Sequence, residues 1–157
     1  MEVLQYYSFS EEGHTKNIFV DYGMRSGILE PEKITRTLGI EPTRKWSKDD
    51  IYWGKKLDVN TQEIVSIQRK RPWGVWAIDT SVLVDSKRVE EHITFLLDLL
   101  RPVENEIQKL LTNIPSYNVS FYIRWEPIDG HGSYEISSKS LHQMSKLCHH
   151  VEFNFLT

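Results

Sequence analysis

The longest regular pattern of apolar residues in the chain runs from residue 89 to residue 111. At 100° per residue its apolar side chains fall on one face of a helix and polar side chains on the other. The apolar set is Val89, Ile93, Leu96, Leu97, Leu100, Val103, Ile107, Leu110 and Leu111. Pro102 lies inside this segment, but the apolar phase continues unchanged beyond it. The pattern therefore predicts one long amphipathic helix that kinks or restarts at the proline.

The other apolar segments are short, and most alternate as strands do. Residues 118–126 alternate most clearly, which predicts a strand with one buried and one polar face. Further strands are predicted at 3–9, 16–22, 64–70, 75–80 and 151–155. One hairpin is predicted to join 3–9 to 16–22, and a second to join 64–70 to 75–80. Residues 41–62 show no period and are predicted to form a long loop.

Two shorter helices complete the prediction. The first covers 31–38, with Pro31 at its first position and Gly39 as its C-terminal stop. The second follows a cap at Ser137, and its buried stripe is predicted to be Leu141, Met144, Leu147 and Cys148.

Together these elements predict a single α+β domain over residues 1–157. Because the long apolar helix needs a sheet to pack on, we expect a mixed, mostly antiparallel sheet of five or six strands, covered by the long helix and the two shorter ones. The uncovered face should present Ser66, Gln68, Tyr122, Arg124, Glu152 and Asn154, either to solvent or to a second subunit.

The composition of the chain bears on the cellular location of the protein. No apolar run approaches the roughly 18 residues of a membrane span, and the first residues lack the basic and apolar regions of a secretory signal. Cys148 is the single cysteine, so no disulfide framework is available. We therefore expect a cytoplasmic protein, monomeric or homodimeric, that does not interact with a membrane.

The order of several motifs resembles a known family. These motifs are the stretch from Leu29 to Thr43 with Leu38-Gly39-Ile40-Glu41-Pro42-Thr43, the strand Gly74-Val75-Trp76-Ala77-Ile78-Asp79, and the segments 90–97 and 132–137. Over about residues 16–156 the chain resembles the bacterial family called domain of unknown function 4279. The resemblance implies a small α+β domain of bacterial or phage origin and brings no mechanism. The chain departs from the family in its longer basic loop between Arg44 and Gln62 and in Asn154, where aspartate is expected.

Charge is distributed unevenly along the chain. Residues 31–71 hold 10 Lys and Arg against 6 Asp and Glu, a net charge of +4, whereas the remainder holds 9 against 16, a net charge of −7. The basic segment also contains tryptophans, and cations beside aromatic rings suit a protein interface or an anionic, base-stacking ligand. The predicted partner-binding residues are Arg44, Lys45, Trp46, Trp53, Lys55, Lys56, Arg69, Arg71 and Trp73.

Catalytic candidates are few. His131 lies between two glycines near Asp129 and Glu126, which is compatible with a general base in a loop or with an ordinary turn. Cys148-His149-His150 lacks the spaced ligand pairs of a zinc site. No phosphate-binding, dinucleotide-binding, serine-hydrolase or metalloprotease motif occurs. We assign no catalytic residue, no metal ligand and no cofactor.

Three functional hypotheses remain. The first is a non-enzymatic binding module that acts by occupying a protein partner, as an immunity-like or phage-defence-related inhibitor would. The second is binding of a nucleic acid or nucleotide through the basic, Trp-rich segment 44–76, against which the overall acidity of the chain counts. The third is a small hydrolase centred on His131.

Overall fold

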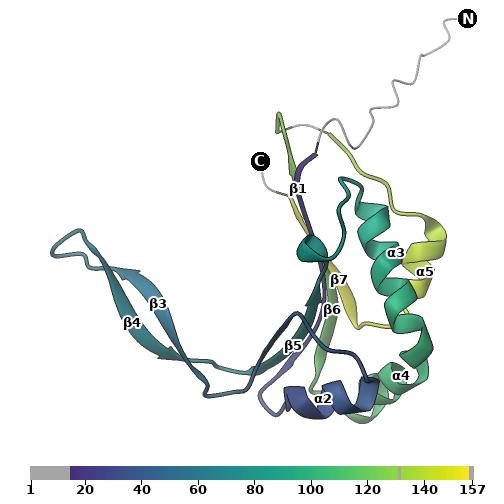
Figure 1. The fold of residues 1–157 in the computed structure, drawn as a ribbon, viewed down its shortest axis with the longest axis horizontal. Coiled ribbons are helices and arrows are strands. Elements are labelled where there is room, and N and C mark those ends of the chain that lie inside the picture. Colours follow the sequence, from purple (N-terminus) through teal and green to yellow (C-terminus); the bar gives the residue numbers. More distant parts are fainter. Residues whose placement is uncertain (1–14, 131, 156–157) are drawn as a thin grey trace, which may run out of the picture.

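The computed structural model describes residues 15–130 and 132–155, which form one α+β domain built on a five-stranded sheet (Figure 1). The strands are β1 (Thr15–Ser26), β2 (Arg44–Trp46), β5 (Gly74–Asp79), β6 (Asn118–Pro127) and β7 (His150–Phe155), in the spatial order β2-β5-β1-β6-β7. All neighbours are antiparallel except β6 and β7, which are parallel. The predicted mixed, mostly antiparallel sheet is confirmed.

The helices all lie on one side of this sheet (Figure 1). They are α2 (Pro31–Leu38), α3 (Val89–Leu100), α4 (Glu104–Asn113) and α5 (Ser138–Met144), with short 3₁₀ turns η1 (Thr80–Val82) and η2 (Arg101–Val103). The second turn contains Pro102, so the long helix restarts at the proline as the apolar phase predicts. Ile93, Leu96, Leu100 and Ile107 from this helix pair are fully buried in the core.

The strands divide their side chains between the helices and the opposite face. On β6, Val119, Phe121, Ile123 and Trp125 are buried, which confirms the alternation predicted for residues 118–126. On β1, Val20, Tyr22 and Met24 face the helices, and Tyr22 donates its hydroxyl proton to the Leu147 carbonyl at 2.8 Å. The opposite face is covered by none of the helices of the described residues and is called the open face below (Figure 1).

The first short helix follows its predicted boundaries, whereas the second begins after its predicted cap but ends at Met144, before Leu147 and Cys148. Gly39 ends α2 at a φ of 65°, and the Ser137 hydroxyl accepts the Ser140 N–H at the start of α5. Met144, Leu147 and Cys148 are buried as predicted. The predicted burial of Leu141 is wrong, because this residue is 44 % exposed. Ser140 takes the inward position instead, where its hydroxyl donates to Glu90 at 2.6 Å.

Residues 41–62 do not form a long loop, and 64–70 does not pair with 75–80, so both predictions are wrong. Strand β2 lies within the supposed loop, and β3 (Ile51–Leu57) pairs with β4 (Ile64–Lys70) in a separate antiparallel sheet. The short segment 71–73 therefore does not turn a hairpin. The predicted strand 3–9 lies outside the described residues, while the predicted strand 16–22 is confirmed as part of the longer β1.

The paired strands β3 and β4 project from the body, on the side of the sheet away from the helices (Figure 1). Because β2 pairs with β5 at their base, the four strands make one long hairpin that bends at residues 47–50 and 71–73. Asp49 N–H donates to the Arg71 carbonyl and Arg71 N–H to the Asp50 carbonyl, at 2.9 and 2.8 Å, so pairing continues through the bend. We call residues 51–70 the ribbon.

Across residues 15–130 and 132–155, no helix has the length and apolar character needed to cross a membrane.

Candidate functional site

A shallow concavity of about 540 Å³ occupies the open face. Its floor is made by small residues that the strand register brings into one line: Ala77 on β5 pairs with Gly23 on β1, which pairs with Ser120 on β6. A row of small side chains between rows of large ones leaves a depression that crosses the strands. We call this depression the trough.

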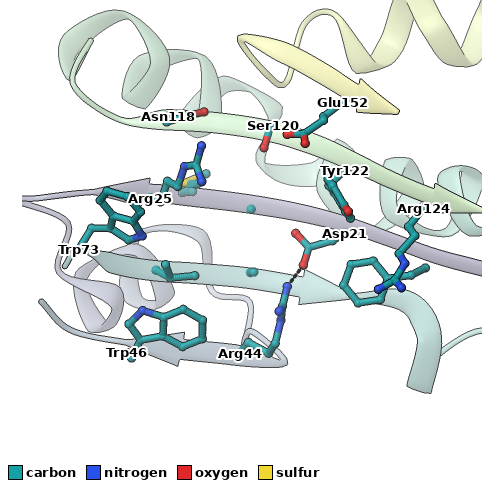
Figure 2. Close-up of a pocket in the computed structure, with 15 residues that line it drawn as sticks. Asp21, Arg25, Arg44, Trp46, Trp73, Asn118, Ser120, Tyr122, Arg124 and Glu152 are labelled. Atoms are coloured by element: carbon teal, nitrogen blue, oxygen red, sulfur yellow. Dashed lines mark hydrogen bonds and ion pairs between the residues drawn. The ribbon is translucent and has the colours of Figure 1, made fainter. Parts of the chain in front are cut away.

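Charged and aromatic side chains form the two walls of the trough (Figure 2). On one side, Asp21 pairs with Tyr122, and Tyr122 with Glu152, so two carboxylates stand in one row. On the other side, Arg25 stands beside Asn118, with its guanidinium 5.6 Å from the centre of the Trp73 ring. One wall therefore carries two carboxylates together with Arg44 and Arg124, and the other wall is basic and aromatic.

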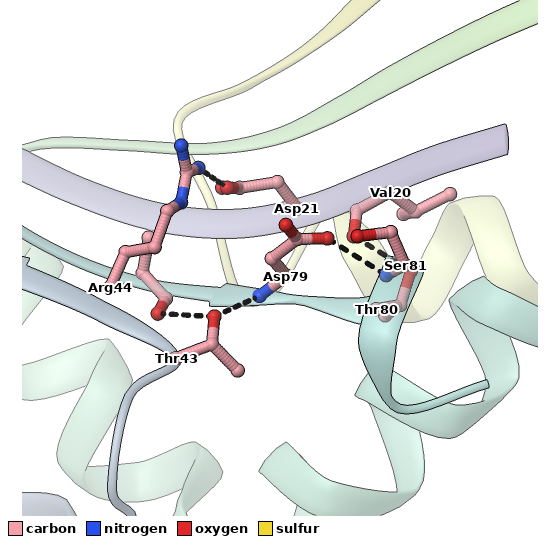
Figure 3. Close-up of polar contacts among 8 residues, drawn as sticks. Val20, Asp21, Thr43, Arg44, Asp79, Thr80 and Ser81 are labelled. Atoms are coloured by element: carbon pink, nitrogen blue, oxygen red, sulfur yellow. Dashed lines mark hydrogen bonds and ion pairs between the residues drawn. The ribbon is translucent and has the colours of Figure 1, made fainter.

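Asp21 and Arg44 form an ion pair at the β2 end of the trough (Figures 2 and 3). The Asp21 side chain is 8 % exposed, while Arg44 reaches it from the edge strand and lies 5.5 Å from the centre of the Phe19 ring. The Thr43 hydroxyl fixes the start of β2 because it accepts Asp79 N–H at 2.7 Å and donates to the Ala77 carbonyl at 3.3 Å. Arg44 is thus held over a buried carboxylate by a defined backbone.

Burial raises the pKa of Asp21 from 3.8 to about 6, even though the Arg44 guanidinium acts in the opposite direction. The neighbouring Asp79 carboxylate contributes a further, smaller rise. The folded state therefore holds this proton more tightly than the unfolded chain does. Charging Asp21 lowers stability as the pH rises from about 4 to about 6, and the full loss persists above that window. Such a buried charge, kept at the expense of stability, is typical of functional surfaces.

Asp21→Asn should stabilise the protein at neutral pH, because the amide keeps the shape of the side chain and an acceptor for Arg44 without the buried charge. The difference in unfolding free energy between variant and wild type should grow by about 2 to 3 kcal/mol from pH 4 to pH 7, in urea melts at each pH.

Glu152→Gln removes an exposed carboxylate from the same face and is the matched control, for which we expect no comparable growth. A difference for Asp21→Asn that stays flat from pH 4 to pH 7 would show that the buried charge carries no such penalty.

A stack of three side chains holds the bend between the sheet and the ribbon. The Arg71 guanidinium lies 4.1 Å from the centre of the Trp46 ring and 3.9 Å from that of Tyr52. Because Trp46 belongs to β2 and Tyr52 to β3, the stack ties the ribbon to the body. Arg71 and Trp46 thus fix the direction in which the ribbon projects.

The ribbon carries exposed apolar side chains on one of its faces. On this face Ile51, Trp53, Leu57 and Ile64 are each between 50 % and 71 % exposed, and Val59, between the strands, is 75 % exposed. The strands alternate so that Lys55 and Lys70 share this face. Arg69 lies on the other face, opposite Tyr52.

Eight of the nine predicted partner-binding residues fall into three places. Trp53, Lys55, Lys56 and Arg69 lie on the ribbon, Trp46, Arg71 and Trp73 at the bend, and Arg44 at the end of the trough. Lys45 points to the helix side instead, where it pairs with Glu32 at 2.9 Å and Glu41 at 3.5 Å. The structure brings together Arg44, Trp46 and Trp73 around the trough, and holds the ribbon residues away from them (Figures 1 and 2).

The polar open face was only partly predicted. Tyr122, Arg124 and Glu152 lie on it as expected, but Ser66 and Gln68 belong to the ribbon and not to the five-stranded sheet. Sequence reasoning missed Asp21, Gly23, Arg25, Ala77 and Ser120. The alternation of β1 could have shown that Asp21, Gly23 and Arg25 share one face. Only the register between the strands aligns this face with Ala77 and Ser120.

The described residues contain no group of three or more His, Cys, Asp or Glu that could hold a metal ion. Glu126 accepts hydrogen bonds from Lys16 and Asn17, each at 2.7 Å, and these hold its pKa below the usual value. Burial raises the pKa of Cys148, whose thiol donates to the Met144 carbonyl, so it is a poor nucleophile. His131 lies outside the described residues, and its predicted role remains a prediction.

The chain belongs to the DUF4279 family, a domain of unknown function, whose model matches residues 18–156. The resemblance in the order of motifs is therefore confirmed over nearly the whole chain. No curated protein and no solved structure is significantly similar to the chain.

Proposed function

We propose that this member of the DUF4279 family is a non-enzymatic binding module that acts by occupying a protein partner through the ribbon and the open face. Within that class we propose an immunity-like or defence-related inhibitor, because blocking a partner needs surface complementarity and no catalytic group. The proposal keeps the predicted basic, Trp-rich segment as its binding surface and adds the trough to it.

The observation that carries the proposal is the exposed apolar face of the ribbon. A two-stranded ribbon is marginally stable by itself and has no second layer to bury its apolar residues. Trp53 is 71 % exposed, with Ile51 two residues away on the same face, and the exposed pair Leu57 and Ile64 lies further along that face, beyond the pair Lys55 and Ser66. Large exposed apolar residues gathered on one face mark interaction sites, and tryptophan is enriched among the residues that dominate binding energy.

The charge of the ribbon favours an acidic partner. Its strands carry Lys55, Lys56, Arg69 and Lys70, against Asp58 and Glu63 in the connection between the strands, so its net charge is +2. These cations produce a local positive field on a chain of net charge −3, which would steer an acidic surface toward the ribbon.

Nucleic acid is the second candidate, supported by the same cations and by exposed Trp53, which could stack on a base. The overall acidity of the chain, with a net charge of −3, counts against broad affinity for a phosphate backbone. For this reason we favour the protein partner.

Trp53→Ala should weaken binding of the partner about 30-fold, equivalent to ~2 kcal/mol, because it removes the central apolar anchor of the ribbon. The partner is captured from a lysate of the native host with immobilised wild-type protein, purified, and titrated by calorimetry against each variant. Phe153→Ala is the matched control, because Phe153 is an exposed aromatic residue on β7, away from the ribbon. Equal affinity of wild type and Trp53→Ala would refute the ribbon as the binding surface.

Lys55→Ala should mainly slow association, and the effect should shrink as salt is raised, because an exposed cation acts through a screened long-range field. Stopped-flow association at low and at physiological ionic strength measures this. If the captured partner is a nucleic acid, each lysine variant should instead reduce the slope of log affinity against log salt by about one phosphate contact.

A further inference from the structure

The two edges of the five-stranded sheet are protected differently. The edge strand β2 has three residues, two of them Arg44 and Lys45, and ends at the bend. The other edge strand, β7, has six residues and contains no lysine, arginine or proline. Short length, basic side chains and prolines are what keep exposed strand edges from pairing with another chain. Within the described residues no strand pairs with the outer side of β7, so this edge is open to a further strand.

The side chains of β7 on the helix side are left partly uncovered. Phe153 and Phe155 lie at the register of Ile123 and Trp125, which are buried on the neighbouring strand β6. At the edge, Phe153 is 45 % exposed and Phe155 is 58 % exposed. One more strand beyond β7 would continue these two rows and cover the aromatic rings.

We propose that β7 pairs antiparallel with β7 of a second copy of this chain, in the register in which the two Phe153 residues face each other. Such a contact is related by a twofold axis, so the strand must be complementary to itself. The two sheets then form one continuous sheet, with the helices of both copies on the same side. This dimer is additional to the proposed function and does not depend on it.

The side chains of β7 select this register. A shift by one residue would place helix-side residues opposite open-face residues, so only alternate registers match the faces. Two of these pair most of the strand, one over residues 150–154 and one over residues 151–155. The first places two Glu152 carboxylates directly opposite each other, which is destabilising. The second places Phe153 opposite Phe153 and Val151 opposite Phe155 on the helix side, with Glu152 opposite Asn154 on the open face.

Charge complementarity supports a second copy as the occupant. Arg124 on β6 lies at the register of Asn154, is exposed, and makes no hydrogen bond or ion pair within the part of the chain that the structure describes. In the proposed register, Glu152 of the second copy faces Asn154 from the other side. Arg124 and that Glu152 are then two strand spacings apart, roughly 10 Å, which their long side chains can span together across Asn154. The twofold axis makes this pair twice.

The proposed dimer leaves the other surfaces accessible. The ribbon follows β2, at the edge of the sheet opposite β7 (Figure 1). The two ribbons of the dimer would therefore project near the two ends of the joined sheet. Pairing at β7 and binding at the ribbon can be tested independently for this reason.

Charge reversal across the contact is the first test, with sedimentation velocity of the full-length protein from low to high micromolar concentration. We expect the wild type to dimerise. Glu152→Arg places a cation opposite Arg124 of the second copy, and Arg124→Glu places two carboxylates together, so each should raise the dimer dissociation constant at least about tenfold. The double variant Arg124→Glu/Glu152→Arg restores opposite charges and should recover the dimer. Glu63→Arg makes the same charge change on the ribbon and should leave the dimer unchanged.

Disulfide trapping tests the register. Directly opposite residues of an antiparallel pair have Cα atoms about 4.5 to 5.5 Å apart, which a disulfide can bridge. Phe153→Cys should therefore cross-link two copies under mild oxidation. Glu152→Cys should not, because diagonal neighbours are about 7 to 8 Å apart. The native Cys148 is buried, so the wild type serves as the uncross-linked control.

Circular dichroism establishes that each variant is folded. A wild type that stays monomeric at every concentration, or a dimer unaffected by either single charge reversal, would overturn the inference. So would a double variant no more dimeric than the single ones, or cross-linking of Glu152→Cys in place of Phe153→Cys.

Discussion

Replacing Leu100 by alanine should lower the free energy of unfolding by ~2 to 5 kcal/mol, the range expected for truncation of a fully buried leucine. Leu100 is fully buried at the end of α3, where the long helix restarts. The truncation removes contacts with the core and leaves a cavity that this junction cannot easily close. Urea unfolding followed by circular dichroism measures the change.

Leu141→Ala provides the control for that experiment, because Leu141 is a leucine on the same side of the sheet but is 44 % exposed. It should cost less than about 1 kcal/mol. Equal losses in the two variants would contradict the assignment of the long helix as the centre of the core.

Gly74→Ala should destabilise the protein by ~3 kcal/mol or more, beyond the ordinary cost of an added methyl group. A Cβ at Gly74 would come within 2.2 Å of the Leu29 carbonyl oxygen, and a backbone atom cannot move aside as a flexible side chain can. Gly74 begins β5, next to the bend, so the clash would displace the strand that carries the ribbon and one side of the trough. Thermal unfolding by calorimetry gives the size of the effect.

Gly27→Ala tests whether the loss is specific, because a Cβ at Gly27 meets nothing within 4 Å. Its melting temperature should stay close to that of the wild type. A Gly74→Ala protein as stable as Gly27→Ala would mean that Leu29 and β5 are not packed as described.

The core of the fold could be predicted because its signals are local. The helical phase of residues 89–111 and the alternation of residues 118–126 each lie within one element, and the apolar side of each determines how it packs. Gly39 and Ser137 end and begin helices through their own backbone or side chain. None of these inferences requires knowledge of which strands are neighbours.

The ribbon could not be predicted because its signals depend on pairing. Strand β3 contains Gly54 and two lysines and does not alternate clearly, so it reads as a loop. The segment 71–73 is short and contains Pro72, so it reads as a turn between 64–70 and 75–80. In the fold, the Arg71 stack bends a long hairpin there, which requires Trp46 and Tyr52 from strands distant in sequence.

Predicting the trough would require knowledge of the strand register even more than predicting the ribbon. Gly23, Ala77 and Ser120 come from three strands and are unremarkable one by one, and only their alignment makes a floor. The residues that carry the family resemblance contribute to the scaffold: Gly39 ends α2, Thr43 fixes the start of β2, and the Trp76 indole donates to the Thr35 hydroxyl at 3.1 Å. The signals readable in the sequence therefore describe the scaffold better than the proposed site.

Hydrogen–deuterium exchange of the protein, free and bound to the partner that the wild type captures, tests the central claim most directly. If the ribbon and the open face hold the partner, exchange should slow in residues 51–70 and in the segments of β1, β5 and β6 that floor the trough, while α3, α4 and α5 keep their free-state rates. Protection confined to those helices, with the ribbon exchanging as fast as in the free protein, would contradict the account.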